Sequence, residues 1–130
     1  MSNEFRFLGH ETSRPGTDLD TFPKPETVTR VSFTSDELTS FCPVTGQPDF
    51  NHVLLEYRPD QLCVESKSLK LYLWSFRDAQ IFGENLADAI ARHIFEAVAP
   101  FYCRVTLTQN IRGGMQLTAV AEIGQAAGDG

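Results

Sequence analysis

The chain has 130 residues, of which 42% are hydrophobic, and a formal net charge of −6 at pH 7. This length is typical of a single domain with a modest core, in which subunit contacts can add the apolar burial that a monomer lacks. The negative charge argues against a nucleic-acid-binding protein, which needs a basic face, but it leaves room for an anionic small ligand held by a local cluster of Lys and Arg.

The two ends of the chain differ in composition from the rest. Residues 1–26 contain several prolines and glycines and are expected to form an irregular N-terminal arm. Residues 124–130, "GQAAGDG", are expected to be a disordered tail. The sequence therefore predicts one folded domain over residues 27–123.

Two strands are predicted first. Residues 27–33, "TVTRVSF", are rich in β-branched side chains. Residues 50–58, "FNHVLLEYR", alternate, with Val53, Leu55 and Tyr57 on one face. The segment between them, "SFCPVTGQPDF" (40–50), has two prolines, a glycine and no apolar periodicity, so it is expected to be a stiff polar loop.

Two helices are predicted next. The first has Ser66 or Ser68 as its N-cap, and the second ends just before Pro100. Apolar residues recur at helical spacing in both segments: Leu69, Tyr72, Leu73 and Phe76, then Leu86, Ile90, Ile94, Ala97 and Val98.

A second hairpin completes the pattern. Residues 101–109 and 115–123 alternate as strands do, and "NIRGG" (110–114) between them provides a turn with two glycines. The order β-β-α-α-β-β predicts an α+β domain, in which an antiparallel four-stranded sheet has two helices on one face.

The three cysteines, Cys42, Cys63 and Cys103, include no C-x-x-C pair, so neither a disulfide framework nor a metal site is expected. Cys63 and Cys103 are interpreted as packing residues. Because no secretory segment or long apolar run occurs, we expect a cytoplasmic protein without membrane contact.

Cys42 and Asp49 lie in the turn-rich segment and have two interpretations each. Cys42 is either an inert, partly buried thiol or a nucleophile, because a thiolate attacks carbon electrophiles well when its pKa is lowered. Asp49 either caps the turn after Pro48 or faces Cys42 and moves a proton to or from a reacting nitrogen. His52 is the nearest histidine and lies in a predicted strand, which argues against a Cys–His hydrolase.

The run "ESKSLKLY" (65–72) places Lys67 and Lys70 on one face of a helical first turn, with Ser66 and Ser68 beside them. Such a helix start is either an anion site or simply a capped, solvated amphipathic helix.

Two further polar positions have a structural and a functional interpretation. Arg112 and Gly113 either form a hairpin turn or help to bind a phosphate at the anion site of residues 65–72. In the second case Arg112 provides a cation and Gly113 allows a close approach of the backbone. Glu84, at the start of the second helix, either favours the helix dipole or accepts paired N–H donors from a guanine-like edge.

Three motifs in this order, "FCPVTGQPDF", "ESKSLKLYLWSFR" and "RGG", resemble 7-cyano-7-deazaguanine reductases, the QueF family of NADPH-dependent nitrile reductases. The resemblance covers residues 28–123. It implies the tunnelling fold (T-fold), with active sites between subunits of a homo-oligomer built from two pentamer rings. It also implies reduction of a 7-deazapurine nitrile to the amine in queuosine biosynthesis, a tRNA modification pathway.

The resemblance assigns roles residue by residue. Cys42 matches the nucleophile that forms a thioimide with the nitrile, and Asp49 matches the acid that protonates nitrogen. Substrate binding falls to Glu84, Glu65 and Ser66, and NADPH binding to Lys67, Ser68, Lys70, Arg112 and Gly113.

One stretch departs from the family pattern. After "SFR" the family continues Asn-His-x-x-Phe-His-Glu, whereas this chain has "DAQIFGE" (78–84), with Ala79 and Gly83 in place of both histidines. The second histidine sits beside the substrate, so we expect an open space at Gly83 and slower or weaker reduction.

Two other functions remain open at this point. A relative that adds an amine to the same nitrile would give an amidine, but such relatives lack the lysine motif that this chain has. A non-catalytic purine-binding module would have no need of Cys42 and Asp49.

Overall fold

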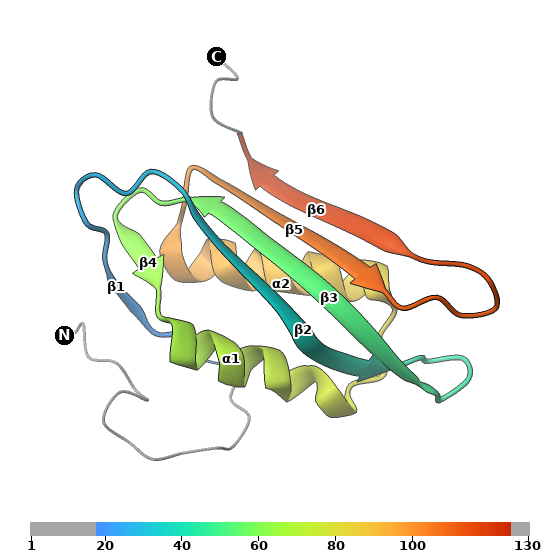
Figure 1. Ribbon diagram of the computed structural model, residues 1–130. Helices are drawn as coiled ribbons and strands as arrows, with labels where there is room; N and C mark the ends of the chain where they lie inside the picture. The colour runs from blue at the N-terminus through green and yellow to red at the C-terminus, as the bar shows by residue number, and fades with distance from the viewer. Residues whose placement is uncertain (1–17, 126–130) are drawn as a thin grey trace.

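The computed structural model describes residues 18–125 (Figure 1). The arm residues 1–17 and the tail residues 126–130 lie outside this range. The elements are, in chain order, β1 (Thr21–Pro23), β2 (Val31–Phe41), β3 (Pro48–Arg58), β4 (Leu62–Val64), α1 (Ser66–Trp74), the 3₁₀ turn η1 (Ser75–Asp78), α2 (Gly83–Val98), β5 (Tyr102–Gln109) and β6 (Thr118–Gly124).

The larger sheet has four antiparallel strands in the order β2-β3-β5-β6. Helices α1 and α2 lie between β3 and β5 in the chain and cover the same face of this sheet (Figure 1). The predicted α+β class, with antiparallel strands and two helices, is confirmed.

The core lies between this sheet and the helices. Val53, Leu55 and Tyr57 of β3 face them and are at most 2% exposed. Ile90 and Ile94 of α2 are fully buried against the same core. Burying a side chain of this size stabilises the fold by roughly 1.5–3 kcal/mol, so the alternation in β3 and the stripe on α2 have a strong energetic basis.

Strand β2 differs most from its predicted range of 27–33. It runs from Val31 to Phe41 and pairs with β3 along its length, with an irregularity between Ser35 and Leu38. The bulge interrupts the alternation of exposed and partly buried residues, and beyond it Leu38 and Ser40 are buried. The polar loop predicted over 40–50 is therefore shortened to residues 42–47.

A small second sheet joins β1 to β4. Residues 21–23 were expected to be irregular, but Phe22 lies opposite Cys63, and the Asp20 N–H donates to Ser68 Oγ over 2.9 Å. The end of the arm thus packs beside the start of α1. Within residues 18–125, none of the helices is long and apolar enough to cross a bilayer.

Candidate functional site

The turn between β2 and β3 holds Cys42 in a tight backbone ring. The Cys42 N–H donates to Gln47 O, and the Gly46 N–H donates to Cys42 O, each over 2.9 Å. Gly46 has φ +72°, a left-handed conformation that glycine adopts without a steric cost. The predicted stiffness of this segment follows from these bonds.

The strand residue before Cys42 is held from the other side. The Phe41 N–H donates to Ala79 O over 2.8 Å, and the Ile81 N–H donates to Phe41 O over 3.0 Å. The linker between η1 and α2 therefore binds both backbone groups of Phe41 at the end of β2. Cys42 directly follows this fixed residue.

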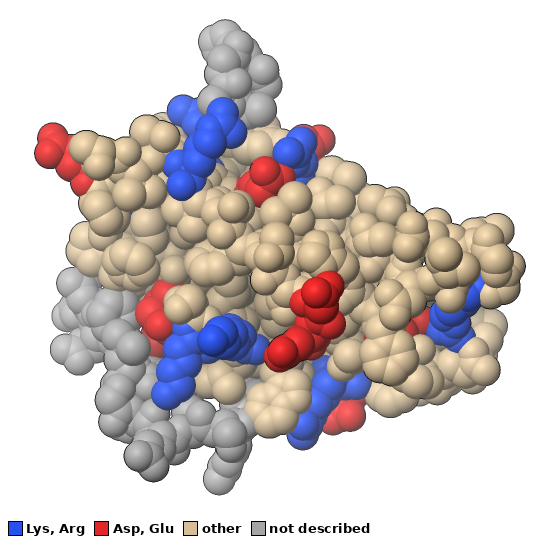
Figure 2. All heavy atoms as spheres, viewed as in Figure 1, with Lys and Arg blue, Asp and Glu red and all other residues tan. Residues whose placement is uncertain are grey.

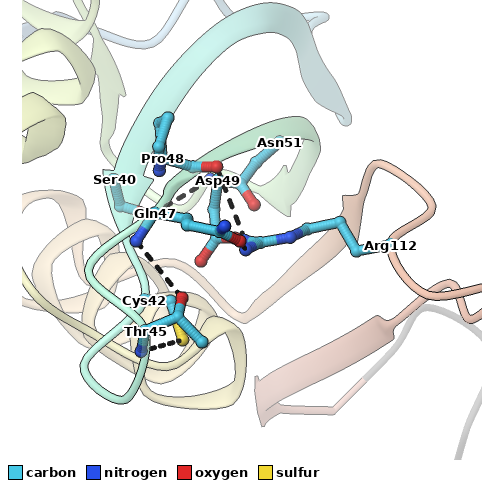
Figure 3. Close-up of polar contacts among 8 residues, drawn as sticks. All are labelled: Ser40, Cys42, Thr45, Gln47, Pro48, Asp49, Asn51 and Arg112. Atoms are coloured by element: carbon cyan, nitrogen blue, oxygen red, sulfur yellow. Dashed lines mark hydrogen bonds and ion pairs between the residues drawn. The ribbon is translucent and has the colours of Figure 1, made fainter.

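The Cys42 thiol is partly exposed and has donors around its sulfur. The Thr45 hydroxyl first, then the Thr45 and Val44 backbone N–H groups, lower the Cys42 pKa, against smaller opposing effects of burial and of the Asp49 charge. The Thr45 N–H lies 3.5 Å from Sγ (Figure 3). Hydrogen bonds to a thiolate stabilise the nucleophilic form, as an attacking cysteine requires.

Asp49 lies at the start of β3 and is 6% exposed. Its carboxylate forms an ion pair with Arg112, whose second nitrogen contacts Gln47 Oε1 (Figure 3). A buried carboxylate needs such a partner, because an unpaired one would be strongly destabilising. Arg112 therefore joins the β5–β6 connection to the Cys42 turn.

The turn that carries Arg112 contains Gly113 and Gly114, with φ +59° and +76°. Arg112 and Met115 exchange both backbone hydrogen bonds, over 2.9 and 3.0 Å. Of the two interpretations given above, the hairpin turn is present. The contact of Arg112 with Asp49 was missed, because no local pattern pairs residues so far apart in sequence.

Two more polar side chains lie further along the sheet, on the face that carries Asp49. Asn51, two residues along β3, is 2% exposed, and its Nδ2 donates to Ser40 Oγ over 3.3 Å. Gln109 of β5 lies directly opposite Asn51. Sequence reasoning did not single out Asn51 or Gln109, although polar residues at apolar-face positions are the pattern that would have found them.

The start of α1 carries the other predicted group. Glu65, rather than Ser66 or Ser68, is the N-cap, and its carboxylate accepts from the Lys67 and Ser68 N–H groups over 2.9 and 2.8 Å. Ser68 is fully buried, and its hydroxyl donates to Glu65 O while accepting from Asp20. The two oxygens of a carboxylate accept from two separate N–H groups, whereas a serine has one hydroxyl oxygen. This difference explains why Glu65, and not a serine, caps the helix.

Ser66 and Lys70 face a groove of about 570 Å³ between α1 and β2, whose other side carries Asp36 and Glu37. Basic atoms lie over the first part of α1 in Figure 2, and acidic atoms lie beside them. The groove thus has a cation and a hydroxyl on the α1 side and two carboxylates on the β2 side, of which Asp36 is paired with His52 over 2.6 Å.

The two groups lie apart within one chain. The Cys42 turn is at one end of the molecule, and the beginning of α1 lies toward the opposite end (Figure 1). The structure brings Cys42, Asp49 and Arg112 together, but it does not bring the α1 lysines to them.

Gly83 begins α2, and the exposed Glu84 follows in its first turn. The space expected beside Gly83 is filled. A Cβ at this position would lie 2.6 Å from Leu117 Cδ2 and 2.9 Å from Gln109 Nε2. A side chain here would have to displace the ends of the Leu117 and Gln109 side chains, whereas backbone shape does not require glycine, since Gly83 is not among the residues with positive φ.

Thr45→Val should raise the Cys42 pKa, because it removes the hydroxyl donor that contributes most to lowering it. The rate of iodoacetamide alkylation at Cys42, followed by mass spectrometry over a pH series, should move to higher pH. Thr45→Ser keeps the hydroxyl and should retain the parental profile. A profile that is the same in Thr45→Val would contradict this account of the thiol.

Gly83→His should lower stability by about 1–3 kcal/mol, because the imidazole must displace Leu117 and Gln109. Urea unfolding measures this cost. Ala79→His, at the other position where the family pattern has histidine, is the matched control and should cost less, because Ala79 is partly exposed. Equal effects at the two positions would argue against crowding at Gly83.

Comparison with known proteins agrees with the motifs. The family described as QueF-like protein matches residues 48–127. The NADPH-dependent 7-cyano-7-deazaguanine reductase of Nitrosospira multiformis is 46% identical over 112 residues, which cover 85% of this chain and 81% of that protein. The enzyme of the same name from Alkalilimnicola ehrlichii is 45% identical over 113 residues, covering 85% of this chain and 88% of that protein.

Among solved structures, the chain resembles an archaeosine synthase of the QueF-like type in its apo form. The TM-score is 0.73 at 27% sequence identity, and the match covers 78% of this chain and 99% of the other. The family match, the reductase relatives and this shared architecture agree, and the chain belongs to the QueF family.

Proposed function

We propose that this protein reduces the nitrile of 7-cyano-7-deazaguanine to the primary amine with NADPH, in queuosine biosynthesis. The observation that carries the proposal is the geometry around Cys42: the Thr45 N–H lies 3.5 Å from its sulfur in a hydrogen-bonded turn, and the strand that follows this turn holds the buried Asp49. The reductase names of relatives at 46% and 45% identity support the same reaction. Such a reaction is expected in the cytoplasm, where thiols stay reduced.

Cys42 activates the nitrile. Its sulfur bonds to the nitrile carbon, one C–N π bond becomes an N–H bond, and the product is a thioimide attached to Cys42. A nitrile is a poor hydride acceptor, and the thioimide C=N is a better one. The hydrogen bonds from Thr45 and Val44 hold the sulfur ready for attack.

Asp49 passes protons to the substrate nitrogen. NADPH held at the α1 groove by Ser66 and Lys70 would supply the hydride, and two equivalents with two protons would convert the nitrile into the amine. Between them the C–S bond breaks, and the sulfur leaves as the thiolate that its donors stabilise. Arg112 balances the charge of Asp49 whenever the carboxylate is ionised.

The α1 groove fits the cofactor. Lys70 and Ser66 line it, and Lys67 lies in the same first turn. The Lys67 and Ser68 N–H groups are bonded to Glu65, so lysine charge and the Ser66 hydroxyl, rather than these two backbone N–H groups, are the groups for a phosphate. Glu65 and Ser68 support this site by shaping the helix start, and Gly113 lets the Arg112 turn approach closely.

A second copy of the chain completes the site. The lysines and Cys42 lie apart within one chain, and β2 and β6 are the edges of the described sheet, free for strands of neighbouring copies. Side-by-side pairing of these edges would close a ring in the manner of the tunnelling fold. We propose a decamer of two pentamer rings, in which Glu84 reads the amino edge of the deazaguanine ring.

A transferase that forms an amidine from the same nitrile is the second candidate, and the similarity to the archaeosine synthase structure favours it. The reductase relatives are more similar in sequence, at 46% against 27% identity, and Lys67 and Lys70 offer charge for a cofactor phosphate that amidine formation does not need. Reduction is therefore the better supported reaction.

Incubation with the nitrile in the absence of NADPH should give a covalent adduct on Cys42, seen as added mass in intact mass spectrometry. Cys42→Ala should give none. Cys63→Ala is the matched control and should keep the adduct, because Cys63 is buried in β4. An adduct that persists in Cys42→Ala would exclude this cysteine as the nucleophile.

Mixing two inactive variants tests the shared site. Cys42→Ala and Lys70→Ala, unfolded and refolded together in equal amounts, should regain about a quarter of parental NADPH oxidation, because random assembly leaves that share of interfaces with both groups intact. Each variant refolded alone is the control. No recovery in mixed oligomers would mean that one chain provides both groups.

A further inference from the structure

Two buried amide atoms lack a hydrogen-bond partner among residues 18–125: Asn51 Oδ1, an acceptor, and Gln109 Nε2, a donor. Such atoms are costly to bury, so their presence calls for a ligand or a change of conformation. The two residues are direct cross-strand partners in β3 and β5, and their side chains share the face that the helices cover.

The amide pair adjoins the candidate site on two sides. Asn51 is two residues from Asp49 on the same strand face, and it is anchored by its 3.3 Å bond to Ser40. On the other side, Gln109 Nε2 lies 2.9 Å from where a Cβ of residue 83 would be, next to Glu84 in the chain. The amide therefore occupies the place where the family pattern has an imidazole.

We propose that Gln109 determines substrate specificity. Its Nε2 donates one N–H to the carbonyl oxygen of the deazaguanine ring and the other to Asn51 Oδ1. Asn51 acts as a positioning residue, since it orients the Gln109 amide without touching the ring. The inference rests on the proposed function, whose substrate it concerns.

The chemistry of the ring selects the carbonyl. A carboxylate such as Glu84 accepts from the ring N–H and the exocyclic amine, so the adjacent carbonyl oxygen needs a donor from another residue. Gly83, the neighbour of Glu84 in the chain, has no side chain, and the donor beside it is Gln109 Nε2. The Leu117 side chain shares this space and must turn away as the ring enters.

Binding of unreactive ligands tests the contact separately from the reduction. The probes are 7-deazaguanine and its 6-thio analogue, which keeps the ring N–H and the amine but has a weaker acceptor. Calorimetry should show that the parent prefers oxygen over sulfur, and that Gln109→Met reduces this preference about fivefold, the value of one net hydrogen bond. Gln116→Met, the same change at an exposed position of the β5–β6 connection, should retain the preference.

Two further variants keep the test independent of folding. Gln109→Glu preserves shape but has no N–H, so it should lose the preference as Gln109→Met does. Asn51→Leu should weaken the preference while its thermal midpoint stays near that of the parent, because removal of the unpaired Oδ1 offsets the loss of the 3.3 Å bond to Ser40 Oγ. A merely structural amide would weaken binding of both ligands equally.

An oxygen preference that is the same in the parent, Gln109→Met and Gln109→Glu would overturn the proposal. Failure of the proposed function looks different, because it would be the absence of a Cys42 adduct or of NADPH oxidation with the nitrile. A Gln109-dependent oxygen preference in a protein that forms no adduct would support the recognition role and reject the reduction.

Discussion

The register of β3 against β5 decides which side chains of the sheet face the helices. With Val53 opposite Leu107 and Tyr57 opposite Cys103, the apolar residues enter the core. The same register places Asn51 opposite Gln109 at the strand end and directs Asp49, two residues earlier, to the same face. A slip of one residue would turn every side chain of β3 to the other face, so core and candidate site depend on one pairing.

Burial of Asp49 extends this dependence to the loops. The carboxylate is balanced by Arg112, which comes from the far hairpin, and Arg112 also contacts Gln47 of the Cys42 turn. Two loops that are distant in sequence are thus linked by charge at the end of a rigid sheet. Catalytic groups that are placed on loops but supported by strands keep their geometry without a large core, which suits a chain of 130 residues.

The elements with strong periodicity, β3 and α2, could be predicted from the sequence. Their buried faces consist of apolar residues at every second position or at helical spacing. Strand β2 could not, since its partner and its bulge are set by tertiary pairing. The cap of α1 was assigned to a serine because Glu65 lies before the helix, where propensity favours hydroxyls. Cys42 and Asp49 were recognised by motif, whereas Gln109 was found only once the space beside Gly83 was seen to be filled.

The hydrogen bonds that bracket Phe41 have a consequence for substrate size. Cys42 follows Phe41 directly, and Glu84 comes three residues after Ile81, so one short linker is hydrogen-bonded next to Cys42 and leads into the helix turn that carries Glu84. The backbone positions of the two residues are therefore linked through the two hydrogen bonds of Phe41. In the proposed reaction, this linkage would favour a heterocycle whose reactive carbon is one bond from the ring over one in which a longer spacer carries the electrophile past the sulfur.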